Sequence, residues 1–354
     1  MCRRSSTARS WTRSTTTTAP SSDSAVTARE PEAPPGIEEI RRAAEALAGL
    51  LPLPTPLIYS PALSERLDAH VSLKLEFANP IGAFKIRGGV FLAGELAAEL
   101  RSTGLVTAST GNHGQSIAYA AGLHGLRAVV FVPEGANPDK VASMRRLGAE
   151  VREQGARFDA ANAAALEFAA EHAMRYVAVD EPLLLPGVAT GALEVLDPDG
   201  GQQPDTELAI VPLGAGSGAC GWVLTREGLG AACEVWAVQS ARAPAGHDSW
   251  REGRIVERPD ETMAEGVATG IGFEGAQAIL RDRLDDFLLV EDETIAAAVV
   301  ELLEQAHLLV EPAGATPLAA ANQARERLAG RRVVLVLSGA NITLAQLRGF
   351  LAAT

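Results

Sequence analysis

One lysine, Lys85, is of a type and in a setting that could supply a nucleophile. It lies in the stretch EFANPIGAFKIRGG, residues 76–89, among small, aromatic and apolar neighbours. Burial disfavours the ammonium form, so the pKa of such a lysine falls and its neutral amine can form a Schiff base with a carbonyl. Arg87 is a nearby cation that would lower the pKa further. A solvated lysine at the start of a helix is the alternative interpretation of this stretch alone.

A glycine loop, Gly214-Ala215-Gly216-Ser217-Gly218, follows directly after the apolar residues 210–213. Glycines let backbone N–H groups approach an anion, and the N-terminus of a following helix adds the positive end of its dipole. The loop has neither the Lys-Ser/Thr pair of a P-loop nor the spacing of a dinucleotide fingerprint. It predicts a phosphate site, with a tight packing turn as the alternative.

Polar groups follow other predicted strands as well. STGNHGQ, residues 109–115, gathers hydroxyl and amide groups around two glycines and suits a carboxylate, although it could also be a helix cap. SGAN, residues 338–341, follows an apolar strand and places Ser338 in the same kind of crevice, again with a helix cap as the alternative. EPAGAT, residues 311–316, brings the carboxylate of Glu311 to the edge of a strand or loop, where an ordinary surface acid is the alternative.

The elements that must position these residues alternate between short apolar strands and helices. Strands are predicted at residues 71–76, 105–109, 128–133, 149–154, 175–181, 207–213, 233–239, 286–292 and 333–341. Helices of 10 to 15 residues between such strands indicate right-handed crossovers and parallel sheets. Asp292 or Glu293 is expected to cap the helix that runs through residues 294–306.

Composition narrows the class of protein. The 354 residues are 47% hydrophobic and 21% charged, which is typical of a soluble globular chain of two domains or one large α/β unit. The formal net charge of −13 argues against nucleic acid and against an anionic membrane as partners. Three cysteines are too few for a disulfide framework, so a reducing cytoplasm is expected, and no apolar run is long enough to span a membrane.

The first 35 residues differ from the rest. They are rich in Ser, Thr and Pro, carry four arginines among residues 3–13, and contain no acid before Asp23. An organelle transit peptide has this composition, but no amphipathic face is present, so a disordered tail or an overextended start is the preferred interpretation.

Six motifs together carry a resemblance to a known family. In order along the chain they are GAFKIRGG, STGNHGQ, LGAGSG, MAEGVATG, EPAGAT and LSGAN. From about residue 36 to its end the chain resembles the pyridoxal-phosphate enzymes of fold type II (tryptophan synthase β-like), and most of all their serine/threonine dehydratase branch, which includes serine racemase. The resemblance implies an α/β fold of two open parallel-sheet domains with the active site in the cleft between them. Residues 36–95 with 183–354 would form the large cofactor domain, and residues 96–182 the small domain.

The resemblance also implies a role for each motif. Lys85 would bind pyridoxal 5′-phosphate covalently. Phe84 would pack on the cofactor ring, Asn112 would bond its phenolic oxygen and Ser338 would meet its pyridine nitrogen. The loop Gly214, Ala215, Gly216, Ser217 and Gly218 would hold the phosphate. The substrate would be bound by Ser109, Thr110, Gly111, Asn112 and His113, with Glu311 as a nearby family acid and Thr110 as a second catalytic residue.

The activity implied is that of an ammonia-lyase, which converts a β-hydroxy amino acid such as L-threonine, L-serine or a larger 3-hydroxy amino acid to a 2-keto acid and ammonia. A serine hydroxyl cannot keep the pyridine nitrogen protonated as an aspartate would, which favours elimination. A β-replacement synthase, an amino acid racemase and a non-catalytic binding homologue are the alternatives. Thr110 stands where the racemases carry a second serine, so efficient racemisation is not expected. No metal is expected, because the strand after the glycine loop leads into Gln239-Ser240-Ala241, and a homodimer is expected by analogy with the family.

Overall fold

The computed structural model describes residues 33–353, and residues 33–354 group into one compact unit. Nearly all of the N-terminal segment assigned above to a leader or disordered tail, residues 1–35, lies outside the described part of the chain.

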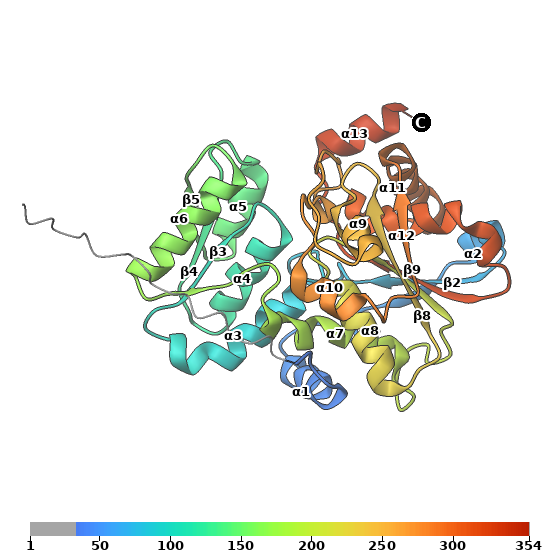
Figure 1. Cartoon of the computed structure of the whole chain (residues 1–354), viewed down its shortest axis with the longest axis horizontal. Coiled ribbons are helices and arrows are strands. Elements are labelled where there is room, and N and C mark those ends of the chain that lie inside the picture. Colours follow the sequence, from blue (N-terminus) through green and yellow to red (C-terminus); the bar gives the residue numbers. More distant parts are fainter. Residues whose placement is uncertain (1–32, 354) are drawn as a thin grey trace, which may run out of the picture. The chain divides into compact units, whose positions relative to one another are not determined.

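Six strands form the larger sheet, in the order β1-β2-β10-β7-β8-β9 (Figure 1). Their bounds are β1 Leu57–Tyr59, β2 His70–Leu75, β7 Leu208–Pro212, β8 Glu234–Ser240, β9 Asp286–Val290 and β10 Arg332–Leu337. All neighbours run parallel except β1, which pairs antiparallel with β2. The edge strand β1 was not predicted from the sequence, since three residues are too few to show a periodic pattern.

Four parallel strands form the second sheet, in the order β5-β4-β3-β6. They are β3 Leu105–Ala108, β4 Ala128–Val132, β5 Glu150–Glu153 and β6 Arg175–Tyr176. All four lie within the segment predicted to be the small domain, residues 96–182, but the boundary proposed after residue 95 falls inside helix α3.

Helices connect the strands. Those of residues 33–200 are α1 Ile37–Leu47, α2 Pro61–Leu67, α3 Ile86–Leu100, α4 Asn112–Leu123, α5 Pro138–Arg146, α6 Phe158–Glu171 and α7 Leu185–Leu196. Those that follow are α8 Ser217–Leu229, α9 Ala245–Glu252, α10 Glu274–Leu280, α11 Asp292–Ala306, α12 Pro312–Gln323 and α13 Leu344–Ala353, with 3-10 turns η1 Pro182–Leu184, η2 Glu265–Val267 and η3 Arg325–Arg327.

Helices cover both faces of each sheet. In β8, Trp236 and Val238 pack with residues of α11 and α12, while Val235 and Ala237 face the opposite way, towards α7 and α8. In the smaller sheet, α3, α4 and α5 cover one face and α6 covers the other. Burial on both faces explains why central strands such as β4 and β10 are nearly continuous apolar runs, as the sequence predicted for the last strand.

One local prediction was incomplete and one was wrong. Glu311 lies at the end of the loop of residues 307–311, as predicted, but it directly precedes the first residue of α12, a helix hidden in the sequence by Gly314 and Pro317. The carboxylate of Asp292 does not cap α11; it accepts hydrogen bonds from Ser240 Oγ, Thr262 Oγ1 and the backbone N–H of Met263. Asp292 thereby fixes the start of the loop that leads into η2. In the described residues, no helix is long and apolar enough to cross a membrane.

Candidate active site

Three neighbouring strands bring the predicted motifs to one edge of the larger sheet. β2, β10 and β7 are adjacent, and the chain continues from their carboxyl ends into Lys85, Ser338 and the glycine loop. In an open parallel sheet, ligands bind at this edge. β3 delivers the loop of residues 109–111 at the carboxyl end of a strand in the other sheet, directly before α4.

Lys85 is half-buried and immediately precedes α3. Its Nζ donates a hydrogen bond of 3.0 Å to Ser217 Oγ, at the start of α8. Burial lowers the pKa of Lys85 to about 8, although attraction to the carboxylate of Asp180 opposes this shift. The Lys85 carbonyl accepts a 2.6 Å hydrogen bond from Ser116 Oγ in α4, so a helix on the other sheet helps to fix this residue.

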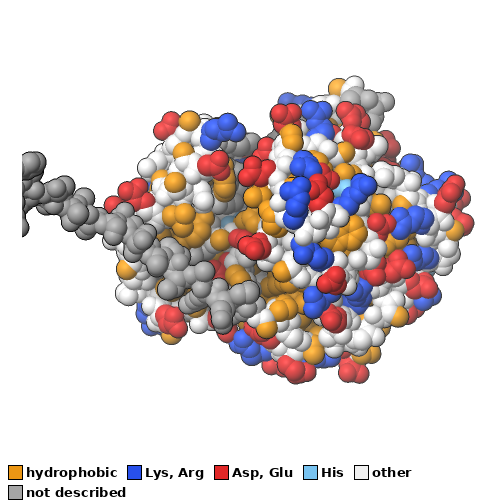
Figure 2. Space-filling model, in the orientation of Figure 1, with side chains coloured by type: hydrophobic (Ala, Val, Ile, Leu, Met, Phe, Trp, Pro, Cys, Tyr) orange, Lys and Arg blue, Asp and Glu red, His pale blue; other side chains and the backbone are white. Residues whose placement is uncertain are grey.

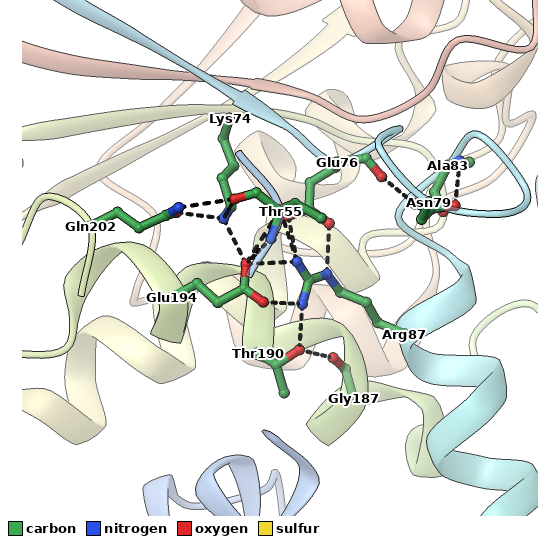
Figure 3. Close-up of polar contacts among 10 residues, drawn as sticks. All are labelled: Thr55, Lys74, Glu76, Asn79, Ala83, Arg87, Gly187, Thr190, Glu194 and Gln202. Carbon is green, nitrogen blue, oxygen red and sulfur yellow. Dashed lines mark hydrogen bonds and ion pairs between the residues drawn. The ribbon is translucent and has the colours of Figure 1, made fainter. Parts of the chain in front are cut away.

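Arg87 does not act on Lys85 as the sequence suggested. Its guanidinium is 1% exposed and is held by Glu76 and Glu194 at 2.7–2.9 Å, with further hydrogen bonds to Thr55 and Thr190. Figure 3 shows this cluster, which we call the Arg87 network. Because two carboxylates neutralise the cation, the lowered pKa of Lys85 follows from burial and not from Arg87.

The Arg87 network is larger than one ion pair. Lys74, whose side chain is fully buried, donates to Glu194 at 2.6 Å, to Gln202 at 2.7 Å and to the Thr55 carbonyl at 2.8 Å (Figure 3). The Arg87 network connects β2, α3 and α7 with the segments that precede β1 and β7, beside Lys85. The sequence could not reveal it, since Arg87 and Glu194 are 107 positions apart.

The glycine loop has the backbone shape of an anion site. Gly216 has a φ of +99°, and an added Cβ there would lie 2.5 Å from the Ala276 side chain. A Cβ on Gly214 would collide with the carbonyl oxygen of Gly266. Packing therefore requires both glycines, as the alternative interpretation held. The loop also leads into α8, a helix of 13 residues whose first turn presents N–H groups without intrahelical acceptors.

Asn112 and Glu311 meet across the two sheets. Asn112 Nδ2 donates to Glu311 Oε1 at 2.8 Å, and Asn112 Oδ1 accepts from Asn341 Nδ2 at 2.7 Å. Glu311 is 9% exposed, and burial raises its pKa to about 7, against the opposing hydrogen bond from Asn112. Gly339 lies so close to this carboxylate that any side chain there would collide with it. Glu311 is thus not an ordinary surface acid.

Ser338 and Phe84 share one cavity beneath this edge of the sheet. Ser338 is 7% exposed, and its carbonyl accepts a 3.0 Å hydrogen bond from the Phe84 N–H. Glu76 of the Arg87 network and Gly218 of the glycine loop line the same cavity. Two of the predicted ring contacts, Phe84 and Ser338, therefore lie together with Gly218 of the predicted phosphate loop.

The loop before α4 places the remaining predicted residues at a helix N-terminus. Ser109 Oγ accepts a hydrogen bond from the Gly111 N–H at 3.2 Å, and an added Cβ on Gly111 would meet no atom within 4 Å. Thr110 is partly exposed. The His113 ring, in contrast, is buried with Nε2 3.1 Å from the Val177 carbonyl oxygen, and burial lowers its pKa to about 4. His113 is therefore neutral near pH 7.

The described residues contain no metal cluster, and the face drawn in Figure 2 carries charges of both signs. Among residues 33–353, no group of three His, Cys, Asp or Glu side chains could hold a metal ion. Figure 2 shows Lys and Arg side chains interspersed with Asp and Glu on the visible face. Such a mixture lacks the continuous basic surface that a nucleic acid needs.

The sequence of residues 50–339 matches the family described as pyridoxal-phosphate dependent enzyme. The chain belongs to this family. It is similar to the L-threonine ammonia-lyase of Geobacter sulfurreducens, with 39% identity over 290 residues that cover 81% of this chain and 71% of that protein. The similarity to the L-threo-3-hydroxyaspartate ammonia-lyase of Saccharomyces cerevisiae is 32% identity, over 82% of this chain and 88% of the yeast protein.

Longer family members match over part of their length. This chain is 32% identical to the biosynthetic L-threonine dehydratase of Salmonella typhimurium, covering 89% of this chain but only 62% of that protein. Among solved structures, the processed form of threonine deaminase isoform 2 from Solanum lycopersicum superposes with a TM-score of 0.83 at 25% identity, over 90% of each chain. The prediction of a fold type II pyridoxal-phosphate enzyme of the serine/threonine dehydratase branch is confirmed.

The residues at the site fit the family's cofactor. A lysine with a pKa of about 8 suits covalent attachment to an aldehyde, and a glycine loop that leads into a helix N-terminus suits a phosphate. Phe84 and Gly218 line one cavity with Ser338, and a Cβ on Gly218 would lie 3.7 Å from the Phe84 ring, so the aromatic side chain packs directly on the glycine loop.

Proposed function

We propose that this protein is a pyridoxal-phosphate-dependent ammonia-lyase that converts a β-hydroxy amino acid, such as L-threonine, L-serine or a larger 3-hydroxy amino acid, to a 2-keto acid and ammonia. The observation that carries the proposal is the half-buried Lys85, with a pKa of about 8, at the sheet edge where the glycine loop and Ser338 also lie. The similarity to ammonia-lyases from a bacterium and a yeast supports the reaction type.

Each motif then has a part in holding the cofactor. Lys85 would bind it covalently, the loop of residues 214–218 would bind its phosphate, and Phe84, Asn112 and Ser338 would surround its ring. When bound, pyridoxal phosphate withdraws electrons from the α-carbon of an amino acid and so makes its α-proton acidic. Ser338 offers a hydroxyl and no negative charge, which limits this withdrawal and favours elimination.

The chain's own groups would handle the substrate. The N-terminus of α4, with Ser109, Thr110 and Asn112, would bind the α-carboxylate. Lys85 Nζ, neutral for part of the time near pH 8, would take the α-proton. Glu311 holds the Asn112 amide in place at 2.8 Å and, with a pKa of about 7, can exchange a proton at neutral pH. Loss of the β-hydroxyl as water and subsequent hydrolysis give the keto acid and ammonia.

Purified protein loaded with pyridoxal phosphate should release keto acid from hydroxy amino acids when no second nucleophile is present. Lys85→Ala should bind cofactor without the covalent linkage and lose its visible absorbance, and its turnover should fall by about 100-fold or more. Circular dichroism of the variant should match the wild type. Unchanged turnover in Lys85→Ala would refute the assigned role of the lysine.

The alternative activities give different products. A β-replacement synthase would need an added nucleophile, and a racemase would lower the optical activity of the amino acid without releasing keto acid. A non-catalytic homologue would give neither result. Thr110 would stand on the face opposite Lys85, where the restricted rotamers of its β-branched side chain support elimination over racemisation.

We further propose a large domain of residues 36–95 and 183–354, a small domain of residues 96–182, a homodimer and a cytoplasmic location. The two sheets support the division, since the strands of the smaller one all come from residues 105–176. Cys220 and Cys233 are free and buried, which suits a reducing compartment. Light scattering after size exclusion would test the dimer, limited proteolysis the domains, and imaging of the tagged protein its location.

A further inference from the structure

A lysine that the proposed mechanism does not use, Lys140, lies close to the site. It belongs to the first turn of α5, and its side chain is only 15% exposed. Its Nζ forms an ion pair with the carboxylate of Glu265, in η2. Glu265 is much more exposed, at 55% of its side chain.

Lys140 and Glu265 line a pocket that adjoins the proposed substrate site. The same pocket is lined by Glu311, Asn341 and Gln346. Glu311 and Asn341 both hydrogen-bond to the Asn112 side chain, which follows the loop proposed to bind the α-carboxylate. An amino acid bound by that loop would therefore have a cation close to the end of its side chain.

The two partners of this ion pair differ in what they lose when it opens. Glu265 can exchange its partner for water, because pairs with an exposed member contribute little to stability. Lys140 is mostly enclosed, so its ammonium needs a full anion in place of Glu265; Glu311 in the same pocket has a pKa of about 7 and carries its charge only part of the time near neutral pH. A ligand carboxylate could take the place of the Glu265 carboxylate, whereas a hydroxyl or a methyl group could not neutralise the charge.

We propose that Lys140 is a specificity-determining residue, and that this pocket receives the second carboxylate of an acidic 3-hydroxy amino acid in exchange for Glu265. The inference rests on the proposed function, which it narrows to substrates that carry a negative charge beyond the α-carboxylate. Thr262 and Met263, held by Asp292, fix the loop from which Glu265 reaches Lys140. A lysine that merely joined the two sheets would not distinguish between substrates.

The test compares the holoenzyme with three variants. Turnover of L-threo-3-hydroxyaspartate, L-threonine and L-serine is followed by keto acid release. Lys140→Met keeps the length of the side chain and removes its charge, and Glu265→Gln removes the competing anion. Arg145→Met is the matched control, since it removes a cation of the same helix that pairs at the surface with Glu153.

Lys140→Met should lower kcat/KM for the acidic substrate by about tenfold or more, the value expected for one charge-assisted hydrogen bond, and should change the neutral substrates far less. Glu265→Gln should raise the ratio of acidic to neutral turnover. Arg145→Met should leave that ratio as in the wild type. An equal loss for all three substrates in Lys140→Met would overturn the inference, because a lysine that only joins the two sheets would give that result.

A binding measurement tests this inference independently of the proposed reaction. Calorimetry measures how tightly L-aspartate and its neutral isostere L-asparagine bind to the protein, and it requires no turnover. If L-aspartate binds more tightly than L-asparagine and this preference is lost in Lys140→Met, the pocket recognises a second carboxylate as proposed. This conclusion holds even if no keto acid forms from any substrate; in that case only the proposed lyase activity is refuted. Equal binding of the two ligands to the wild-type protein, or binding that does not respond to Lys140→Met, would overturn the inference while leaving the lyase activity open to its own assay.

Discussion

The Arg87 guanidinium neutralises the carboxylates of Glu76 and Glu194. Replacing Arg87 with methionine should therefore lower the free energy of unfolding, because these carboxylates lose that cation. Methionine fills much of the same space without the charge. In the wild type the five N–H groups of the guanidinium make six contacts with oxygens of Thr55, Glu76, Thr190 and Glu194, one N–H being shared, all between 2.7 and 3.0 Å. Arg87→Met removes all six at once.

The size of the effect follows from what each carboxylate retains. Glu194 keeps Lys74 as a cation at 2.6 Å, whereas the side chain of Glu76, 4% exposed, keeps only the Thr55 hydroxyl at 2.9 Å as a hydrogen-bond partner among those described above. Breaking a buried ion pair by removing one partner costs about 3–5 kcal/mol, because the other charge stays buried. We expect a loss of this size in the free energy of unfolding at pH 8.

The loss should depend on pH. Burial alone would raise the pKa of Glu76, but Arg87 and Lys74 hold it below its ordinary value of 4.5. A depressed pKa contributes stability above the ordinary value, and this contribution is lost as the pH falls. Without Arg87, burial should raise the pKa of Glu76. At acid pH this carboxyl group then becomes protonated, and the variant no longer has a buried, unpaired negative charge. The difference between wild type and Arg87→Met should therefore be smaller at pH 5 than at pH 8.

Urea unfolding followed by circular dichroism at both pH values measures this difference. The double variant Arg87→Met/Glu76→Gln is the matched control, since it removes the charge that the single variant leaves without a partner. It should recover about 1–3 kcal/mol at pH 8. A loss that is equal at both pH values and is not reduced in the double variant would refute the reasoning from buried charge.

Other predictions follow from single side chains. Burial raises the pKa of Glu311 to about 7, so this group favours folding at acid pH by about 3 kcal/mol and loses that contribution as the pH rises from 4.5 to 7. Glu311→Gln should abolish this pH dependence of the free energy of unfolding, measured by urea unfolding at several pH values. Gly216→Ala should retain less pyridoxal phosphate after dialysis, measured by absorbance, because the new side chain is strained at a φ of +99° and collides with Ala276. Gly230→Ala is the control: it also has a positive φ but open space around it, and it should retain as much cofactor as the wild type. Thr110→Ser should raise racemisation relative to elimination, measured by chiral chromatography; an unchanged ratio would contradict the assignment of Thr110 to the face opposite Lys85.

Local patterns in the sequence predicted the edge of the larger sheet well. Lys85, the glycine loop and Ser338 each follow an apolar run, and the runs proved to be adjacent strands because parallel strands must present their carboxyl ends together. The dipole of α4 and the polar residues before it could likewise be predicted from residues 109–115.

Interactions between distant residues could not be predicted. Arg87 was interpreted as a nearby cation that lowers the pKa of Lys85, because its partner Glu194 is 107 positions away in the sequence. The helical start of α12 behind Glu311 was missed because Gly314 and Pro317 lower helix propensity, while burial of nearly all the small residues of α12 stabilises it in the fold. Lys140 was missed for a related reason, since only the fold brings the first turn of α5 against η2.

The order of strands also determines when this protein can first become active during its synthesis. β10 lies between β2 and β7, yet it is the last of the strands described for residues 33–353 to leave the ribosome. Until residue 337 has emerged, β2 has a bare edge, and the peptide groups that later pair with β10 remain open to other chains. During the synthesis of some 250 residues, the nascent chain therefore contains Lys85 but lacks β10. In this interval we expect chaperones to bind and aggregation to begin.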